Sequence, residues 1–221
     1  MNTKTNSDTL KKVSYLIAGI SASLIMAACG GPRPKAVKSS EVKVTETPVK
    51  PVEAAQGRMA IPFEIATQAA LEGHEDTVIQ ALETGTDPNQ IDENGRTLLM
   101  LTAFNGHTSI LERLINEGAK LDTQDMAGRT ALMYASTGKN LPTVSLLLDH
   151  KAKVNLVDGG EHWSAIMFAA AEGNKEVVEL LLQHEADISL MDIDDETAES
   201  FARDNGHLEL ADLLKKLAEE Q

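Results

Sequence analysis

The sequence has few aromatic residues and a single cysteine. Phe, Trp and Tyr make up 3% of the 221 residues, whereas 42% of the chain is apolar. The core must therefore be built from aliphatic side chains and methionine, which suits small repeated helical units better than a large mixed sheet. One cysteine excludes an intrachain disulfide and a metal site built from several cysteines. Stability must come from packing alone.

Long apolar runs are also scarce near the N-terminus. The uncharged run at residues 13–28 has 16 residues, whereas a membrane-spanning helix needs roughly 20. Three lysines and one acid precede this run. A basic head followed by a short apolar run is typical of a secretory signal peptide. We therefore expect residues 1–28 to be a signal peptide that is removed on export.

Cys29 directly follows this run, in the stretch IMAAC at residues 25–29. The stretch resembles the lipobox of bacterial lipoproteins, although Met26 stands where that family prefers Leu. The resemblance implies that Cys29 is acylated and becomes the new N-terminus. Gly30, rather than Asp, at the next position implies sorting to the outer membrane, facing the periplasm. The alternative is a secreted protein with one free thiol, which is a liability in an oxidising compartment.

Residues 29–57, beginning with the lipidated cysteine, are predicted to form a disordered tether. They hold four of the seven prolines, together with five basic and three acidic residues, and show no helical period. Such a composition cannot bury a core. The excess of positive charge favours contact with anionic lipid or a cell-wall polymer, and the alternative is a solvated spacer.

The remaining residues, 58–221, repeat with a fixed period. Four glycines fall 33, 67 and 33 residues apart, at Gly73, Gly106, Gly173 and Gly206. Each glycine separates two helical patterns, and the second helix carries apolar pairs four residues apart, such as 177–178 and 181–182. This spacing buries one stripe of each helix. The period predicts five units, at about 60–91, 92–124, 125–157, 158–191 and 192–221.

The phrases NGRTLLMLTAFNGH, AGRTALMYASTGK, EHWSAIMFAAAEGN and DETAESFARDNGH resemble the ankyrin repeat. The resemblance implies an all-α ankyrin solenoid of about five helix-turn-helix repeats joined by β-hairpin-like loops. A Thr or Ser before each first helix should cap it by accepting an orphan backbone N–H bond. These residues are Thr97, Thr130, Ser164 and Thr197. Gly85 and Gly118 should end second helices in a left-handed conformation.

Several departures from the family pattern carry expectations of their own. Methionines 100, 133 and 167 replace the usual first-helix His, so soft packing should replace a polar bridge. The loop VDGGEHW has one extra residue and should be longer and looser. The first unit lacks the Thr cap and the last has Glu199 in place of Leu, as expected of terminal caps that face water.

No catalytic or metal-binding motif is evident. A nucleophile elbow, a phosphate-binding loop, a zinc signature and a Gly-x-Gly-x-x-Gly motif do not occur. The segment DIDDET at residues 192–197 resembles half of a calcium loop, but Thr197 replaces the turn glycine and Arg203 the closing glutamate. We expect a protein that is not an enzyme, with no cofactor, no metal and no small-molecule substrate.

The charge of the repeats indicates the class of partner, and surface position indicates which residues would contact it. Residues 58–221 contain 30 acids and 12 bases, which excludes nucleic acid and favours a basic protein partner; alternatively, the charge only keeps an exported protein soluble. In ankyrin arrays the loop tips and first-helix starts line a concave binding face. The candidate contacts there are Trp163, Phe104, Met126, Arg96, Arg129, Glu93, Asn94, Asn105, Glu172, Ile193 and Asp194.

Trp163, the only tryptophan, leads this set because Trp is enriched at interface hot spots; the alternative is that it covers the long loop. The sequence thus indicates a lipid-anchored protein-interaction module that contacts the bilayer through Cys29. We expect a scaffold or assembly factor that stabilises an envelope protein. The alternative is an inhibitor, such as an immunity protein that blocks a toxic enzyme in the periplasm.

Overall fold

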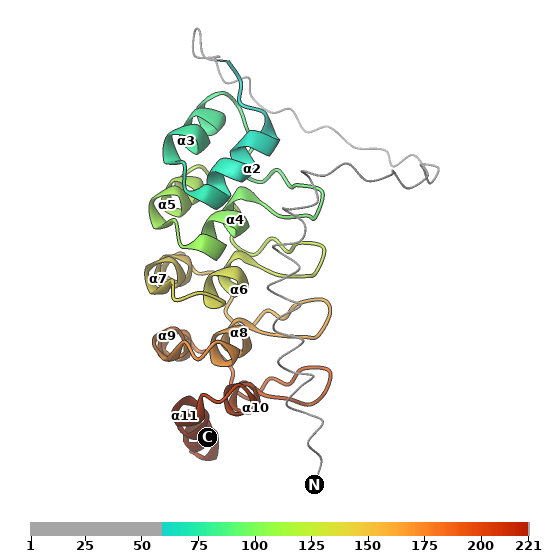
Figure 1. The fold of residues 1–221 in the computed structure, drawn as a ribbon, viewed down its shortest axis with the longest axis vertical. Helices are drawn as coiled ribbons and strands as arrows, with labels where there is room; N and C mark the ends of the chain where they lie inside the picture. The colour runs from blue at the N-terminus through green and yellow to red at the C-terminus, as the bar shows by residue number, and fades with distance from the viewer. Residues whose placement is uncertain (1–58, 221) are drawn as a thin grey trace, which may run out of the picture. The chain divides into compact units, whose positions relative to one another are not determined.

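The computed structural model describes residues 59–220, which contain ten α-helices arranged as five helix-turn-helix pairs in two parallel rows (Figure 1). The first helices are α2 (Phe63–Glu72), α4 (Leu98–Asn105), α6 (Ala131–Ser136), α8 (Ala165–Ala171) and α10 (Ala198–Asp204). The second helices are α3 (Glu75–Glu83), α5 (Thr108–Asn116), α7 (Leu141–Asp149), α9 (Lys175–Gln183) and α11 (Leu208–Glu219). Hairpin loops join the pairs and project beside the first helices (Figure 1). The predicted all-α solenoid is confirmed.

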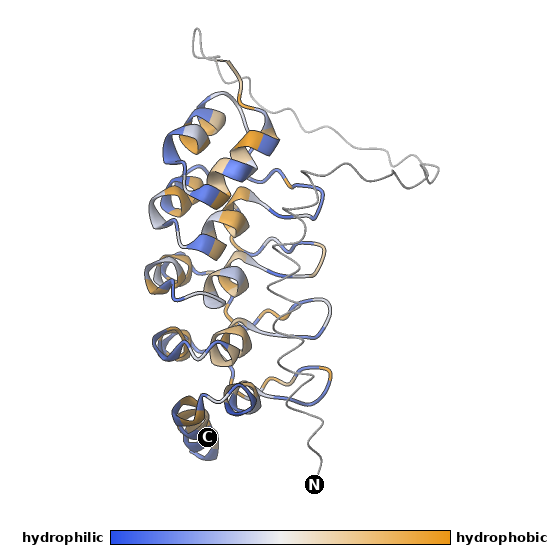
Figure 2. Ribbon diagram, in the orientation of Figure 1, coloured by the Kyte–Doolittle hydropathy of each residue, from blue (hydrophilic) through white to orange (hydrophobic). Residues whose placement is uncertain are grey.

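The core lies between the two rows of helices and is mainly aliphatic. Every residue of α8 is buried, because α6, α9 and α10 all pack against it. Alanines dominate this helix and let its neighbours approach closely. The second helices bury one face only and keep a hydrophilic outer face (Figure 2). No helix within residues 59–220 is long and apolar enough to cross a bilayer.

Three of the first helices, α4, α6 and α8, begin at caps that include a methionine sulfur atom. The hydroxyls of Thr97 and Thr130 accept hydrogen bonds from the backbone N–H groups of Met100 and Met133, both at 3.4 Å. The methionine sulfurs accept in return from the cap N–H groups, at 3.5 Å for Thr97 and 3.4 Å for Thr130 and Ser164. The expectation of purely soft packing at these methionines is therefore incomplete, because their thioethers make a directional contact within each repeat.

Adjacent repeats are joined at the ends of α2 and α4. His107 Nε2 lies 3.0 Å from the Leu71 carbonyl of the preceding repeat, and Asn140 Nδ2 donates to the Phe104 carbonyl at 3.0 Å. Gly73 and Gly106 sit directly against these side chains, with φ of +82° and +75°. A Cβ atom at Gly106 would lie 2.4 Å from Asn140 Oδ1. The glycine period therefore reflects both backbone conformation and close approach between repeats.

A second set of hydrogen bonds joins the repeats just after the C-terminal ends of the second helices. Asn89 donates to the Gly118 carbonyl at 3.1 Å and accepts from the Lys120 N–H at 2.8 Å. Asn155, two repeats later, makes the same two bonds: it donates to the Glu185 carbonyl at 3.0 Å and accepts from the Asp187 N–H at 2.8 Å. One side chain therefore satisfies both a donor and an acceptor of the next repeat.

Trp163 belongs to the core, which contradicts its predicted place on the binding face. Its side chain is 1% exposed and packs edge-on against Phe168 and Phe201, with ring centroids 5.3 and 4.4 Å away. Its indole N–H donates to Asp192 Oδ2 at 3.2 Å. The prediction that Trp163 lies outside the core and contacts a partner is wrong, because the next repeat covers the ring completely.

This burial predicts a large stability loss for Trp163→Ala. Removing a fully buried Trp should lower the free energy of unfolding by about 3–5 kcal/mol, measured by urea or thermal denaturation. Met126→Ala is the control, because Met126 is 80% exposed and should change stability by less than about 0.5 kcal/mol. Equal stability of the two variants would contradict the core assignment.

Candidate protein-binding surface

Four hairpins, at residues 90–97, 124–130, 157–164 and 190–197, form a row that we call the tip row. Near the start of each hairpin stands an aspartate whose Oδ1 accepts two backbone N–H bonds from the same hairpin. The pairs of donors are Asn94 and Arg96 for Asp92, Ala127 and Arg129 for Asp125, Glu161 and Trp163 for Asp158, and Asp194 and Glu196 for Asp192, at 2.8–3.1 Å. Each carboxylate thereby fixes the shape of its hairpin.

This column of aspartates was not predicted, although its regular spacing is visible in the sequence. The four aspartates fall 33, 33 and 34 residues apart, and the longer interval contains the extra residue of the third hairpin. That hairpin still makes two bonds to Asp158, which is buried. The expected loosening of this loop is therefore not found.

The described residues contain no group of three or more His, Cys, Asp or Glu that could hold a metal ion.

Backbone hydrogen bonds also run from one hairpin to the next. Met126 N–H donates to the Asn94 carbonyl at 3.0 Å, and Gly159 N–H donates to the Ala127 carbonyl at 2.8 Å. Ile193 N–H completes the series by donating to the Glu161 carbonyl at 3.1 Å. The four tips are thus connected into one surface whose spacing is fixed by the backbone.

Part of the predicted contact set lies exposed on the tip row. Met126 is 80% and Ile193 is 54% exposed, and Glu93 and Asp194 are exposed beside them. Asn94 is half-buried in the first hairpin. Two further exposed apolar residues, Ile91 and Met191, were not predicted. Their common position, directly before the hairpin aspartate, was the signal that would have identified them.

Other predicted residues serve the fold or lie elsewhere. Arg96 is held by Asp92, with Nη2 to Oδ2 at 2.7 Å. Phe104 is half-buried and packs edge-on against Tyr134, with ring centroids 6.2 Å apart.

Two more members of the set lie away from the tip row. Asn105 and Glu172 are at the ends of α4 and α8 that point away from the hairpins, and the side chain of Asn105 donates to the Leu71 carbonyl. The structure therefore does not bring these two together with the tip residues.

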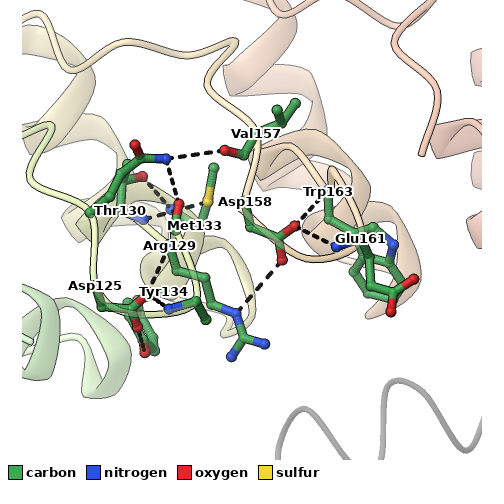
Figure 3. Close-up of polar contacts among 12 residues, drawn as sticks. Asp125, Arg129, Thr130, Met133, Tyr134, Val157, Asp158, Glu161 and Trp163 are labelled. Atoms are coloured by element: carbon green, nitrogen blue, oxygen red, sulfur yellow. Dashed lines mark hydrogen bonds and ion pairs between the residues drawn. The ribbon is translucent and has the colours of Figure 1, made fainter. Parts of the chain in front are cut away.

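A polar cluster lies at the base of the second and third hairpins (Figure 3). The Tyr134 hydroxyl donates to Asp125 Oδ2 at 2.6 Å. Burial, together with this bond and the negative charge of Asp125, raises the pKa of Tyr134 well above its ordinary value. Tyr134 therefore stays protonated at neutral pH and acts as a hydrogen-bond donor. Arg129 lies beside it, with Nε 3.8 Å from Asp158 Oδ2.

Glu172 gives a pH-dependent prediction. Burial raises its pKa, and the nearby His207 opposes this shift. A raised carboxyl pKa means that the folded state binds the proton of Glu172 more tightly than the unfolded state does. The stability that comes from this protonation is present at low pH and is lost as pH rises through the shifted pKa. Glu172→Gln should therefore raise the melting temperature at pH 7 by about 1–2 °C and leave it unchanged near pH 3. Glu176→Gln, on the exposed face of α9, is the control; an equal gain there would contradict the assignment.

Comparison with known families agrees with this geometry. The family model described as ankyrin repeats (3 copies) matches residues 66–158 and 155–220. A search of curated proteins finds no match to the chain. Ankyrin repeats are protein–protein interaction modules, and the matched residues include all four hairpins of the tip row. Since the match spans well over half of the chain, the protein belongs to the ankyrin repeat family.

Proposed function

We propose that the protein is a lipid-anchored interaction module that holds or stabilises another protein of the cell envelope through its tip row. The observation that carries this proposal is the set of exposed apolar side chains on tips whose spacing is fixed. These are Ile91, Met126, Met191 and Ile193, which are 54–80% exposed. Apolar residues in such positions do not stabilise the repeat, and they gain free energy only when a partner covers them.

The charge of the tip row supports a basic partner. Its four hairpins carry nine carboxylates and two guanidinium groups, so their formal charge is negative. The two guanidinium groups, of Arg96 and Arg129, lie beside Asp92 and Asp158. The field of a negatively charged surface speeds association with a positively charged protein and disfavours acidic ones.

The anchor rests on the sequence alone, because the signal peptide, Cys29 and the tether lie outside the described residues. Acyl chains on Cys29 would hold the protein stably on a bilayer, at about 0.8 kcal/mol for each buried CH₂ group. The tether would let the repeats reach an envelope partner, and Gly30 after the cysteine favours the periplasmic face of the outer membrane. In this proposal the lipid fixes the location and the repeats supply the binding.

Cys29→Ser tests the anchor. The variant should move from the membrane to the soluble envelope fraction and should lose labelling by a fatty-acid probe. Ser39→Ala, in the tether, is the control and should remain labelled and membrane-bound. A wild-type protein that takes up no fatty-acid probe would refute the anchor without affecting the binding surface.

Tip-row variants test the binding surface. Proteins bound in the intact envelope are first crosslinked and identified by mass spectrometry. Met126→Asp and Ile193→Asp should each reduce recovery of the identified protein by about tenfold or more, because a charge replaces an apolar contact. Leu208→Asp is the control, since Leu208 is about as exposed as Ile193 but lies at the start of α11.

Equal losses from all three variants would contradict binding at the tips. If the recovered protein is an enzyme that is inactive in the complex, the inhibitor role replaces the scaffold role.

A further inference from the structure

The hairpin aspartates differ in what binds their second carboxylate oxygen. In the first hairpin, Arg96 binds its own aspartate through two nitrogens: Nε and Nη2 lie 2.8 and 2.7 Å from Asp92 Oδ2. This pair is closed, because one carboxylate oxygen occupies the fork of the guanidinium. Arg96 is consequently a structural residue of its hairpin.

Arg129 holds the equivalent position in the second hairpin but does not make the equivalent pair. The Tyr134 hydroxyl donates to Asp125 Oδ2 at 2.6 Å, and the backbone N–H groups of residues 127 and 129 bind Oδ1. With Asp125 occupied, Arg129 turns towards the third hairpin. There its Nε stays 3.8 Å from Asp158 Oδ2, which is beyond hydrogen-bond distance.

The guanidinium of Arg129 is held in place without having its donors satisfied. Its central carbon lies 5.9 Å from the centroid of the Phe168 ring, and its side chain is only 17% exposed. Nε is buried without a hydrogen-bond partner. Within residues 59–220 neither terminal nitrogen makes a hydrogen bond, and Figure 3 shows both pointing away from Asp125 and Asp158.

The residues that correspond to Arg129 in the other three hairpins show that this arrangement is specific to the second hairpin. Arg96 is closed on Asp92, and Trp163 and Glu196 stand at the corresponding places in the third and fourth hairpins. Trp163 reaches forward to Asp192 Oδ2, as Arg129 reaches towards Asp158. Within the tip row, Arg129 is therefore the one guanidinium with open donors.

We infer that Arg129 is a recognition residue whose terminal nitrogens donate to backbone carbonyl oxygens of an extended segment of the protein partner. A fixed guanidinium fork suits planar oxygen acceptors. Of its three nitrogens only Nε is buried without a partner, so the terminal nitrogens are accessible to acceptors of another chain. A neutral carbonyl fits better than a carboxylate, because Asp125 and Asp158 already lie beside the position. This inference rests on the proposed function and specifies the chemistry of the same surface.

Tyr134 has a positioning role in this inference. Because its hydroxyl occupies Asp125, it keeps Arg129 from forming the closed pair seen at Arg96. Tyr134→Phe should free Asp125 Oδ2 and let Arg129 close on it, which removes the open donors without removing the arginine. The substitution deletes one oxygen atom, so packing against Phe104 is retained.

Labelling with phenylglyoxal, which reacts with guanidinium groups, tests the open state without a partner. Arg96 and Arg129 have similar exposure, at 12% and 17%, so exposure alone predicts similar rates. We expect Arg129 to be labelled several-fold faster than Arg96 in the wild type, and at the Arg96 rate in Tyr134→Phe. Peptide mapping by mass spectrometry gives both rates, and equal wild-type rates would overturn the inference.

Binding is tested with a phage-displayed library of random twelve-residue peptides selected on the purified exported protein. Selected peptides should lose about tenfold or more in affinity with Arg129→Lys, which keeps the charge but loses the fork. Tyr134→Phe should cause a similar loss and Arg96→Lys none, with melting curves confirming that all variants fold.

Peptides that depend on Met126 and Ile193 but not on Arg129 would overturn this inference and leave the proposed function intact. A selection that yields no binding peptide would also overturn it, while the proposed function would still be decided by envelope crosslinking.

Discussion

Each repeat completes hydrogen bonds that the preceding repeat cannot make by itself. The last carbonyl groups of a first helix have no intrahelical partner, and here His107 and Asn140 supply one from the next repeat. Their side chains reach these carbonyls only because Gly73 and Gly106 have no Cβ in the way. The alignment of the helices, the position of the hairpins and the spacing of the tip row all depend on this contact between neighbours.

The tip row combines exposed apolar side chains with charged carboxylates, which have opposite effects on association in water. Its apolar residues, such as Met126 and Ile193, favour association, whereas its carboxylates keep the surface hydrated and repel acidic proteins. The backbone bonds between hairpins hold these groups at fixed separations, so a partner meets a preorganised surface and little ordering entropy is lost on binding. Selectivity then depends on which side chain stands at each hairpin position rather than on movement of the scaffold.

The sequence predicted those features that depend on local spacing. The glycine period located the helix pairs, and the threonines before the first helices located their caps. It failed at Trp163, because the burial of this residue is decided by Phe201 and Asp192, which lie in the next repeat. The open state of Arg129 was equally hidden, since it depends on a hydroxyl nine residues from Asp125. A contact across repeats decided the first outcome and a side-chain contact within one repeat decided the second, and neither follows from residue spacing.

The third hairpin has one residue more than its neighbours, yet Asp158 still accepts two backbone N–H bonds and Gly159 still bonds to the second hairpin. The added residue is absorbed locally, with His162 in a left-handed conformation at φ of +62°. Loop length is thus decoupled from the pitch of the stack. A scaffold with this property allows its recognition loops to lengthen or change during evolution, or by design, while the helices behind them keep their positions.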